Sequence, residues 1–257
     1  MDLGLAGRTA VVCASTSGLG EATARALAAE GARVVVSGRR GERAVEIAAE
    51  LPEAVGAGVD LTEPDGPETL VARARDAFGP VDVLVLNSGG PPPSTAATLD
   101  TDALTDALVP LLLAQQRLVS LVLPAMRERG WGRVLGVGSS GVVAPIPGLA
   151  LSNVGRAALA GYLKTLAGEV ARDGVTVNVL LPGRIATART AQVDGNVAER
   201  EGIAADDVAA RAAAAIPAGR YGTAAEFGAV AAFLCSDAAS YVTGTATRCD
   251  GGLVGGL

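Results

Sequence analysis

The stretch from Thr9 to Gly20 reads TAVVCASTSGLG and decides the fold class of the chain. It runs from a predicted strand (8–14), through a turn of small residues, into an Ala-rich segment of helical period (18–30). Glycines in such a turn let the backbone approach a pyrophosphate, whose charge then lies against the free N–H groups of the helix N-terminus. The stretch therefore indicates a dinucleotide-binding turn, with an ordinary tight turn as the alternative. The residues expected to contact the cofactor here are Ser15, Ser17, Gly18, Leu19 and Gly20.

Short β-branched runs alternate with longer Ala-rich segments along the rest of the chain. Further strands are predicted at 33–37, just before Asp60, and at 81–86, 132–137, 175–180 and 244–248. Helices are predicted at 42–51, 67–78, from near Pro110 towards Met126, and at 149–173 and 224–236. This alternation is typical of β-α-β units, so we expect the α/β class: a Rossmann-like doubly wound parallel sheet. The chain is expected to form a single domain, 1–257, with a substrate flap at about 184–218, because long segments without strands are often lids.

Composition and charge exclude several functions. Hydrophobic residues make up 49% and charged residues 19% of the chain, and no stretch has the composition of a linker. The chain has no histidine, which removes the commonest metal ligand and the usual triad base, so we expect no metal site. A net charge of −6 argues against binding to nucleic acid. The three scattered cysteines, and the lack of a long apolar run near the start, predict a cytoplasmic protein without a membrane segment.

Several motifs at matching spacing resemble the short-chain dehydrogenase/reductase family along almost the whole chain. That family carries Thr-Gly-x-x-x-Gly-Ile/Leu-Gly at the phosphate turn, where this chain has Ala14 at the first glycine. We expect this departure to be small, because Ala tolerates most right-handed and extended backbone angles. The resemblance implies that Asp60 with Leu61 lies against the adenine, and that Pro182-Gly183 borders the nicotinamide. Further implied cofactor contacts are Asn87, Ser88, Gly89, Ile185 and Thr187.

The choice of nucleotide depends on the end of the second predicted strand. It reads Ser37-Gly38-Arg39-Arg40, so two arginines stand where an enzyme that uses NAD would place a carboxylate for the ribose hydroxyls. A guanidinium group suits a 2′-phosphate because its planar fork makes paired, charge-assisted hydrogen bonds. Arg39 and Arg40 therefore favour NADP(H) over NAD(H), although both could simply be solvated at a turn.

The catalytic residues of the family are expected on the fifth strand and the helix after it. Family members place a Tyr and a Lys four residues apart at the start of this helix, on one helical face. The segment 156–159, RAAL, is similar to the family's Lys-Ala-Ala-Leu, which puts Ser152 at the Tyr position and Arg156 at the Lys position. Ser139, thirteen residues before Ser152, resembles the family's catalytic Ser, whereas the family's helical Asn is absent. The resemblance thus implies a 3-oxoacyl-carrier-protein reductase-like subgroup in which the Tyr and Lys are replaced.

The replacement removes the usual proton relay. A serine hydroxyl does not release a proton near neutral pH without a base, and a guanidinium remains protonated. We therefore expect Ser152, Asn153 and Arg156 to bind a polar or anionic substrate, beside Ser139. The proton could come from water, from the substrate or from a carboxylate of the flap, where the candidates are Asp194, Glu199 and Asp206. Tyr162 and Lys164 lie further along the same helix and are expected to lie too deep.

These observations favour an NADP(H)-dependent oxidoreductase that acts on a small carbonyl-type or related substrate with a non-standard active site. Two alternatives remain open: a nucleotide-binding pseudoenzyme that supports an active partner subunit, and a non-redox enzyme that performs dehydration or cyclisation on the same fold. Detection of hydride transfer would separate the first interpretation from the others. The resemblance also implies a homodimer or homotetramer built on the two long helices.

Overall fold

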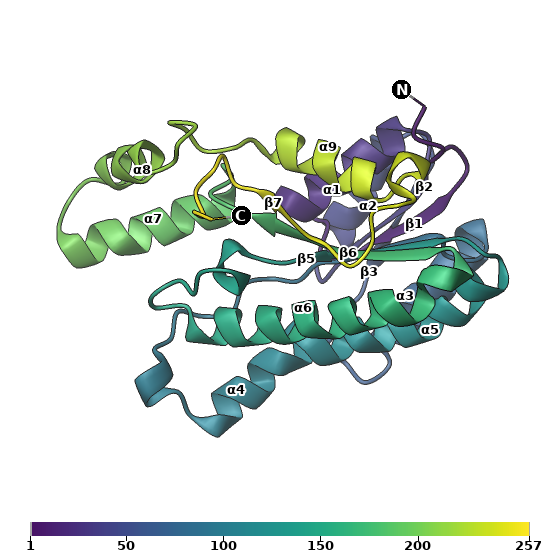
Figure 1. Ribbon diagram of the computed structural model, residues 1–257, viewed down its shortest axis with the longest axis horizontal. Helices are drawn as coiled ribbons and strands as arrows, with labels where there is room; N and C mark the ends of the chain where they lie inside the picture. Colours follow the sequence, from purple (N-terminus) through teal and green to yellow (C-terminus); the bar gives the residue numbers. More distant parts are fainter. Residues whose placement is uncertain (1, 257) are drawn as a thin grey trace.

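The computed structural model describes residues 2–256 and consists of one seven-stranded sheet with helices on both faces (Figure 1). All neighbouring strands are parallel, in the order β3-β2-β1-β4-β5-β6-β7. The doubly wound parallel sheet predicted from the alternating pattern is therefore confirmed. The strands are β1 (Thr9–Val12), β2 (Arg33–Gly38), β3 (Ala54–Gly58), β4 (Val83–Leu86), β5 (Gly132–Val137), β6 (Val175–Pro182) and β7 (Ala246–Cys249).

Two helical layers cover the sheet, and each has its own apolar core. On one face lie α1 (Gly18–Ala29), α2 (Gly41–Ala49) and α9 (Ala224–Leu234), which pack on Ala10 and Val12 of β1. On the other face lie α3 (Gly66–Phe78), α5 (Ala114–Glu128) and α6 (Ala150–Val170), which pack on Val11. Successive strand residues point to opposite faces, so a strand buried on both sides is apolar throughout. This explains the unbroken runs of Val and Leu in the central strands.

The helix expected near Pro110 has an irregular turn inside it. It begins as α4 (Thr101–Leu108), passes through a π-helical turn (Val109–Leu113) and continues as α5. Together the segment 101–128 has the length and the mean hydropathy, 1.5, of a membrane-spanning helix. However, Leu118, Val119, Val122 and Met126 of α5 are buried against the sheet, as in the core helix of a globular fold.

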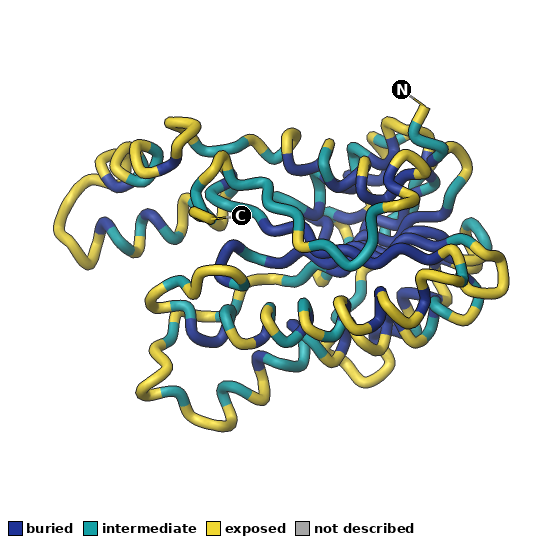
Figure 2. The backbone as a smooth tube through the Cα atoms, in the orientation of Figure 1, coloured by how far each residue is buried: buried dark blue, intermediate teal, exposed yellow. Residues whose placement is uncertain are grey.

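The predicted flap is largely helical. It contains α7 (Ala188–Glu201) and α8 (Ala205–Ala214), which extend beyond the end of the sheet in Figure 1. Figure 2 shows that the central strands are buried, whereas these two helices are mostly exposed. Their few buried residues are Asp194, Ala198 and Val208. The pair therefore rests on the domain through a narrow contact.

The packing of α1 on α9 requires Gly228. A Cβ at this position would lie 2.6 Å from the carbonyl oxygen of Ala22 in α1. Gly228→Ala is expected to lower the free energy of unfolding by about 1–3 kcal/mol, because the helices cannot separate without loss of core contacts. The matched control is Gly195→Ala in α7, where no atom lies within 4 Å of the added Cβ, and where better helix propensity should stabilise the fold by about 0.5–1 kcal/mol. Urea unfolding followed by circular dichroism measures both, and equal effects would contradict this account of the contact.

Candidate active site

The structure brings the predicted site residues to one edge of the sheet. Each loop that leaves the carboxyl end of β1 to β6 carries at least one of them, and α6 adds three from its first two turns. The chain reverses its direction of winding between β1 and β4, which are neighbours in the sheet. In open α/β sheets such a switch point leaves a crevice in which ligands bind.

The phosphate turn is held in a strained conformation. Ala14 has φ of +45°, and it is the only residue other than glycine with positive φ in 2–256. The expectation that this departure from the family pattern is small is wrong, because a side chain in the left-handed region costs roughly 1–2 kcal/mol. Gly18 also has positive φ, +58°. Gly20 permits the close approach of α1 to β1, since a Cβ there would lie 2.4 Å from the Ala14 carbonyl oxygen.

Two side chains support this turn from below. Ser15 is buried; its hydroxyl donates to the Val12 carbonyl (2.7 Å) and accepts from the backbone N–H of Ser37 (2.8 Å). Asn87, at the end of β4, donates from Nδ2 to the Ala14 carbonyl (3.2 Å). The Ser15 side chain therefore joins β1 to β2, and Asn87 joins the turn to β4. The N-terminus of α1, from Ser17 onward, remains open at the crevice: Ser17 is exposed and makes no side-chain cap.

Of the two arginines after β2, one is attached to the phosphate turn. Arg40 donates from Nη2 to the carbonyl of Thr16 (2.7 Å), and Nη2 also contacts the Thr16 hydroxyl (3.1 Å). Arg39 is exposed and lies near enough to Asp60 for its charge to lower the pKa of that carboxyl group. Thr16 was not among the predicted site residues, and its place between the turn and Arg40 follows only from the folded structure.

Asp60 follows β3 and is held in a defined orientation. Its Oδ1 accepts hydrogen bonds from the backbone N–H (3.0 Å) and the hydroxyl (2.8 Å) of Thr62. These bonds, first of all the one from the backbone, lower the pKa of Asp60 below its ordinary value, because they stabilise the carboxylate. Neither bond uses Oδ2 of Asp60. The neighbouring Leu61 packs against the core cluster below.

The exit of β6 lies opposite the phosphate turn. Gly183 lies so close to Asp250 that an added Cβ would be 2.6 Å from the Asp250 Cβ. Ile185 is buried, and its two neighbours bond to Gly222 through the backbone. Thr187 caps α7 by accepting from the N–H of Thr190 (3.3 Å), and its Cγ2 would lie 3.7 Å from a Cβ at Gly18. The N-termini of α1 and α7 thus face each other at one point, beside Pro182 at the end of β6.

The hydroxyl groups of the candidate catalytic residues differ in their partners. Ser139 follows β5, and its Oγ accepts from the backbone N–H of Gly141 (3.0 Å), which leaves the hydroxyl proton free to donate. The Ser152 hydroxyl has no hydrogen-bond partner within residues 2–256, and this residue is partly exposed. Asn153 is used structurally: its amide accepts from the N–H of Ile146 (3.3 Å) and donates to the Ile146 carbonyl (3.0 Å). It therefore holds the loop between Ser139 and α6.

Arg156 crosses from α6 to the ends of two strands. Its Nη1 donates to the carbonyl of Val137 in β5 (2.7 Å), and its Nη2 lies 3.5 Å from the carbonyl of Ser88 after β4. Burial and, to a smaller extent, the positive charge of Arg189 lower the pKa of Arg156 to about 10. A guanidinium with this pKa is still protonated at neutral pH, so Arg156 is a cation and not a proton acceptor.

The other candidate proton donors are engaged elsewhere. Asp194 is buried; it pairs with Arg184 and accepts from the hydroxyl of Tyr221 (2.8 Å). It is thus not the mobile flap carboxylate that the sequence suggested. Lys164 donates to the carbonyl of Gly244 (2.7 Å) at the β7 edge of the sheet, and burial raises the pKa of the half-buried Tyr162. Glu199 and Asp206, also proposed as proton sources, are exposed on α7 and α8.

A buried glutamine behind the site was missed. Gln115 in α5 donates from Nε2 to the carbonyls of Pro110 (3.0 Å) and Asn87 (3.4 Å), and its Oε1 has no partner within residues 2–256. It bridges the π-helical turn to the end of β4. Its signal was present in the sequence as a polar residue within the apolar segment 111–119, LLLAQQRLV. Arg189, on the first turn of α7, was also missed.

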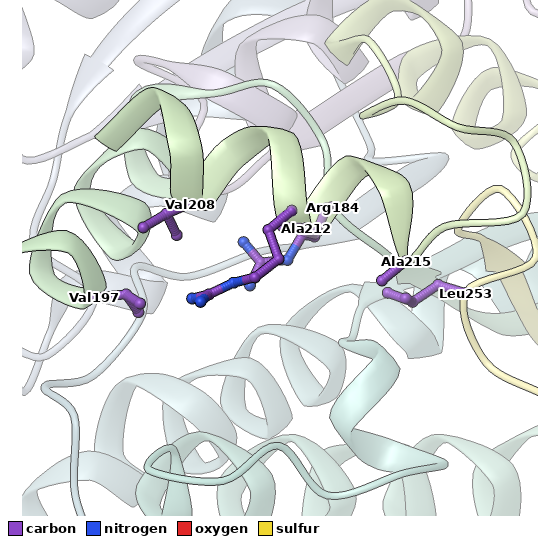
Figure 3. Close-up of a pocket in the computed structure, with 7 residues that line it drawn as sticks. Arg184, Val197, Val208, Ala212, Ala215 and Leu253 are labelled. Atoms are coloured by element: carbon purple, nitrogen blue, oxygen red, sulfur yellow. The ribbon is translucent and has the colours of Figure 1, made fainter. Parts of the chain in front are cut away.

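A cavity of about 270 Å³ lies beneath the flap (Figure 3). Its walls come from both flap helices and from the C-terminal tail, through Val197, Val208, Ala212 and Leu253. Arg184 lines it and pairs with Asp194, which fastens α7 to the exit of β6. The cavity is mainly apolar and adjoins the loop that carries Ile185 and Thr187.

Comparisons with known proteins agree with this arrangement. A sequence model described as enoyl-(acyl carrier protein) reductase matches residues 13–254. The chain is 34% identical over 248 residues to 3-oxoacyl-[acyl-carrier-protein] reductase FabG of Salmonella typhimurium, covering 96% of this chain and 97% of that protein. L-Sorbose reductase from Gluconobacter frateurii, solved with NADPH and L-sorbose, has a TM-score of 0.94 at 32% identity over 100% of both chains. An actinorhodin polyketide ketoreductase variant with NADPH has a TM-score of 0.90 at 33% identity, over 96% and 97% of the two chains.

The fold and the crevice thus define an oxidoreductase of the Rossmann type. The chain belongs to the short-chain dehydrogenase/reductase family and to its 3-oxoacyl-carrier-protein reductase-like subgroup.

The strain at Ala14 leads to a direct test. Ala14→Gly is expected to raise the free energy of unfolding by about 0.5–1 kcal/mol, because glycine adopts positive φ without a steric cost but loses more chain entropy on folding. Ala10→Gly in β1, where no positive φ occurs, is the control and should destabilise the protein. Thermal unfolding by calorimetry measures both. A loss of stability in Ala14→Gly as large as that in the control would show that Ala14 is not strained.

Proposed function

We propose that this protein is an NADP(H)-dependent oxidoreductase that acts on a small carbonyl-type substrate. The observation that carries the proposal is the crevice itself, where a glycine turn, two facing helix N-termini and Arg39 and Arg40 surround the switch point of the sheet. The residues fit a dinucleotide phosphate group: Gly18 and Gly20 present no side chain, and Thr187 faces them. Bound NADPH supplies a hydride for a carbonyl carbon.

The preference for the phosphorylated cofactor rests on charge. Arg39 is free of any acid partner within 4 Å in residues 2–256, and Arg40 extends from Thr16 at the turn. Arg43, one turn further along α2, pairs instead with Glu46 and Glu21. A 2′-phosphate at the end of β2 would neutralise Arg39 and Arg40 but not Arg43. That relatives have been solved with NADPH supports the same choice.

We propose further that the proton relay is non-standard, with Ser152 and Arg156 in place of the family's Tyr and Lys. Ser139 then remains as the hydroxyl that can donate to a substrate oxygen, because its proton is free. Arg156 stabilises negative charge without giving up a proton. The proton for the product comes from solvent or from the substrate, since Asp194 is fixed in its pair with Arg184. A pseudoenzyme or a non-redox enzyme remains the competing proposal if no hydride transfer is found.

The quaternary structure is proposed to be a homodimer or homotetramer in the cytoplasm. The outer face of α6 offers small residues, where a Cβ at Gly161 or Gly168 would meet nothing within 4 Å. Two exposed apolar side chains lie on the neighbouring helical turns, Val154 (43% exposed) and Leu113 (54% exposed). A flat face of this kind permits close approach of two helices from different subunits. The flap (184–218) is proposed to cover the substrate.

The cofactor preference is measured by fluorescence titration. The unmodified protein is expected to bind NADPH more tightly than NADH. Arg39→Gln should weaken NADPH binding by roughly 1.5–3 kcal/mol and leave NADH unchanged, because one hydrogen-bonded ion pair with the 2′-phosphate is lost. Arg43→Gln is the matched control and should change neither affinity, since its partners are Glu46 and Glu21. Equal affinity of the unmodified protein for both cofactors would refute the preference.

The non-standard relay is tested by kinetics. Ser152→Ala is expected to lower kcat by less than about tenfold, whereas loss of a true general acid costs about 10²–10⁴. Arg156→Ala should raise KM, because the guanidinium binds and does not transfer a proton. The rate should show no ionisation from α6 between about pH 6 and 9, since the pKa of Arg156 is about 10 and Ser152 does not titrate there. Abolished turnover in Ser152→Ala with intact NADPH binding would make Ser152 a catalytic hydroxyl.

A further inference from the structure

Two arginines at the crevice have no acidic partner. No carboxylate oxygen of residues 2–256 lies within 4 Å of the guanidinium of Arg156 or of Arg189, although the same part of the chain contains twelve such ion pairs. Arg133, which is 3% exposed, pairs with Asp237, and the partly buried Arg184 pairs with Asp194. Arg156 is partly buried, whereas Arg189 is exposed, so the cost of a buried charge without a counter-charge applies to Arg156.

Arg156 uses only part of its hydrogen-bonding capacity. It donates to the Val137 carbonyl (2.7 Å) and, at 3.5 Å, lies at the limit of a bond to the Ser88 carbonyl. A guanidinium has five N–H donors, so at least three remain. Val137 is the last residue of β5, two positions before Ser139, and Ser88 follows Asn87 just after β4. The group is therefore held at the floor of the crevice and not at the outer surface.

Arg189 reaches the same loop from the flap. Its Nη2 donates to the carbonyl of Pro91 (3.1 Å), and a Cβ at Gly90 would lie 3.2 Å from its Nε and Nη2, so the guanidinium lies flat on this loop. The remaining polar side-chain contact is with Gln192 (3.0 Å), which is neutral. Arg189 is on the first turn of α7, where the helix dipole disfavours a cation. Arg189 thus has only neutral partners and an unfavourable place in the helix dipole, and a nearby anion would offset both.

The two guanidinium groups converge on one segment. Arg156 contacts residue 88 and Arg189 contacts residue 91, three positions apart in the loop 88–93, SGGPPP, after β4. Their charges are close enough that Arg189 lowers the pKa of Arg156. Gly89 and Gly90 lie between the two contacts, and the three prolines that follow stiffen the rest of the loop. The protein therefore holds two like charges side by side without a neutralising acid.

We propose that Arg156 and Arg189 form an anion subsite that holds a carboxylate of the substrate, so that the protein reduces oxo acids to hydroxy acids. A carboxylate matches the planar fork of each guanidinium and neutralises both. This inference rests on the proposed function, since it names the substrate class of the same site. The reaction balances: an oxo acid, NADPH and one proton give a hydroxy acid and NADP⁺; the hydride forms the new C–H bond, and the oxygen takes the proton.

A cofactor phosphate is the other source of negative charge. The phosphate turn faces Thr187, whereas the contacts of Arg189 are with Pro91 and Gly90 on the opposite loop. The geometry therefore assigns Arg189 to the substrate. Arg189 thus places a positive charge of the flap at the loop after β4.

Matched acid and ester pairs test the proposal: 2-oxobutanoate against its methyl ester, and 3-oxobutanoate against its methyl ester. Steady-state oxidation of NADPH gives kcat and KM, and calorimetric titration of oxamate into the complex with NADP⁺ gives binding without turnover. The unmodified protein is expected to prefer at least one acid to its ester by about 10- to 100-fold in kcat/KM, and to bind oxamate. Arg189→Gln should raise KM for the acid, and the Kd of oxamate, about tenfold or more, while the ester is unaffected.

Arg200→Gln on the exposed end of α7 is the matched control and should change none of these values. Arg156→Lys keeps the charge but removes the planar fork, so it should weaken the preference for the acid less than Arg156→Gln does. This comparison guards against a variant that merely fails to fold. Equal use of acid and ester, or an NADPH affinity that falls in Arg189→Gln while the acid preference stays, would overturn the subsite. Absence of NADPH binding to the unmodified protein would instead refute the proposed function.

Discussion

The contact between Gly20 and the end of β1 is the constraint on which the rest of the site depends. Because α1 lies so close to the Ala14 carbonyl, the turn between them must fold back sharply, and Ala14 adopts positive φ. That sharp turn points the N-terminus of α1 at the crevice between β1 and β4. Asn87 then bonds to the same carbonyl and fixes the neighbouring loop. One close approach of backbone to backbone thus aligns two of the loops that form the cofactor site.

The second organising feature is the distribution of positive charge along the carboxyl edge of the sheet. Arg39 and Arg40 lie at one end, and Arg156 and Arg189 lie at the other, across the central strands. Arg133, at the opposite end of β5, is instead paired with Asp237. The unpaired cations instead make the crevice attractive to anions, although the chain as a whole carries a net charge of −6.

The flap is attached to the rest of the domain through few contacts. Its helices bury little surface against the sheet, and the pair Arg184–Asp194 with Tyr221 is the main polar attachment near the site. Segments with few buried contacts open at low free-energy cost, which suits a cover for substrate entry and product release. The apolar cavity beneath the flap adjoins this attachment through Arg184.

The sequence by itself determined the fold class and the order of the strands in the chain. The burial pattern of a strand and a turn of small residues are local properties. The strand β1 and the turn through Gly20 could therefore be predicted from neighbouring residues. The same holds for the place of Arg39 and Arg40 at the end of β2. Only the tertiary structure decided which side chains are free to act. Asp194 is bound to Arg184, Asn153 holds a loop, and Arg189 joins Arg156 from 33 positions further along the chain. Such pairings depend on distances between loops that share an edge of the sheet, and the physical reason is that charge and hydrogen bonding act through space and not along the chain.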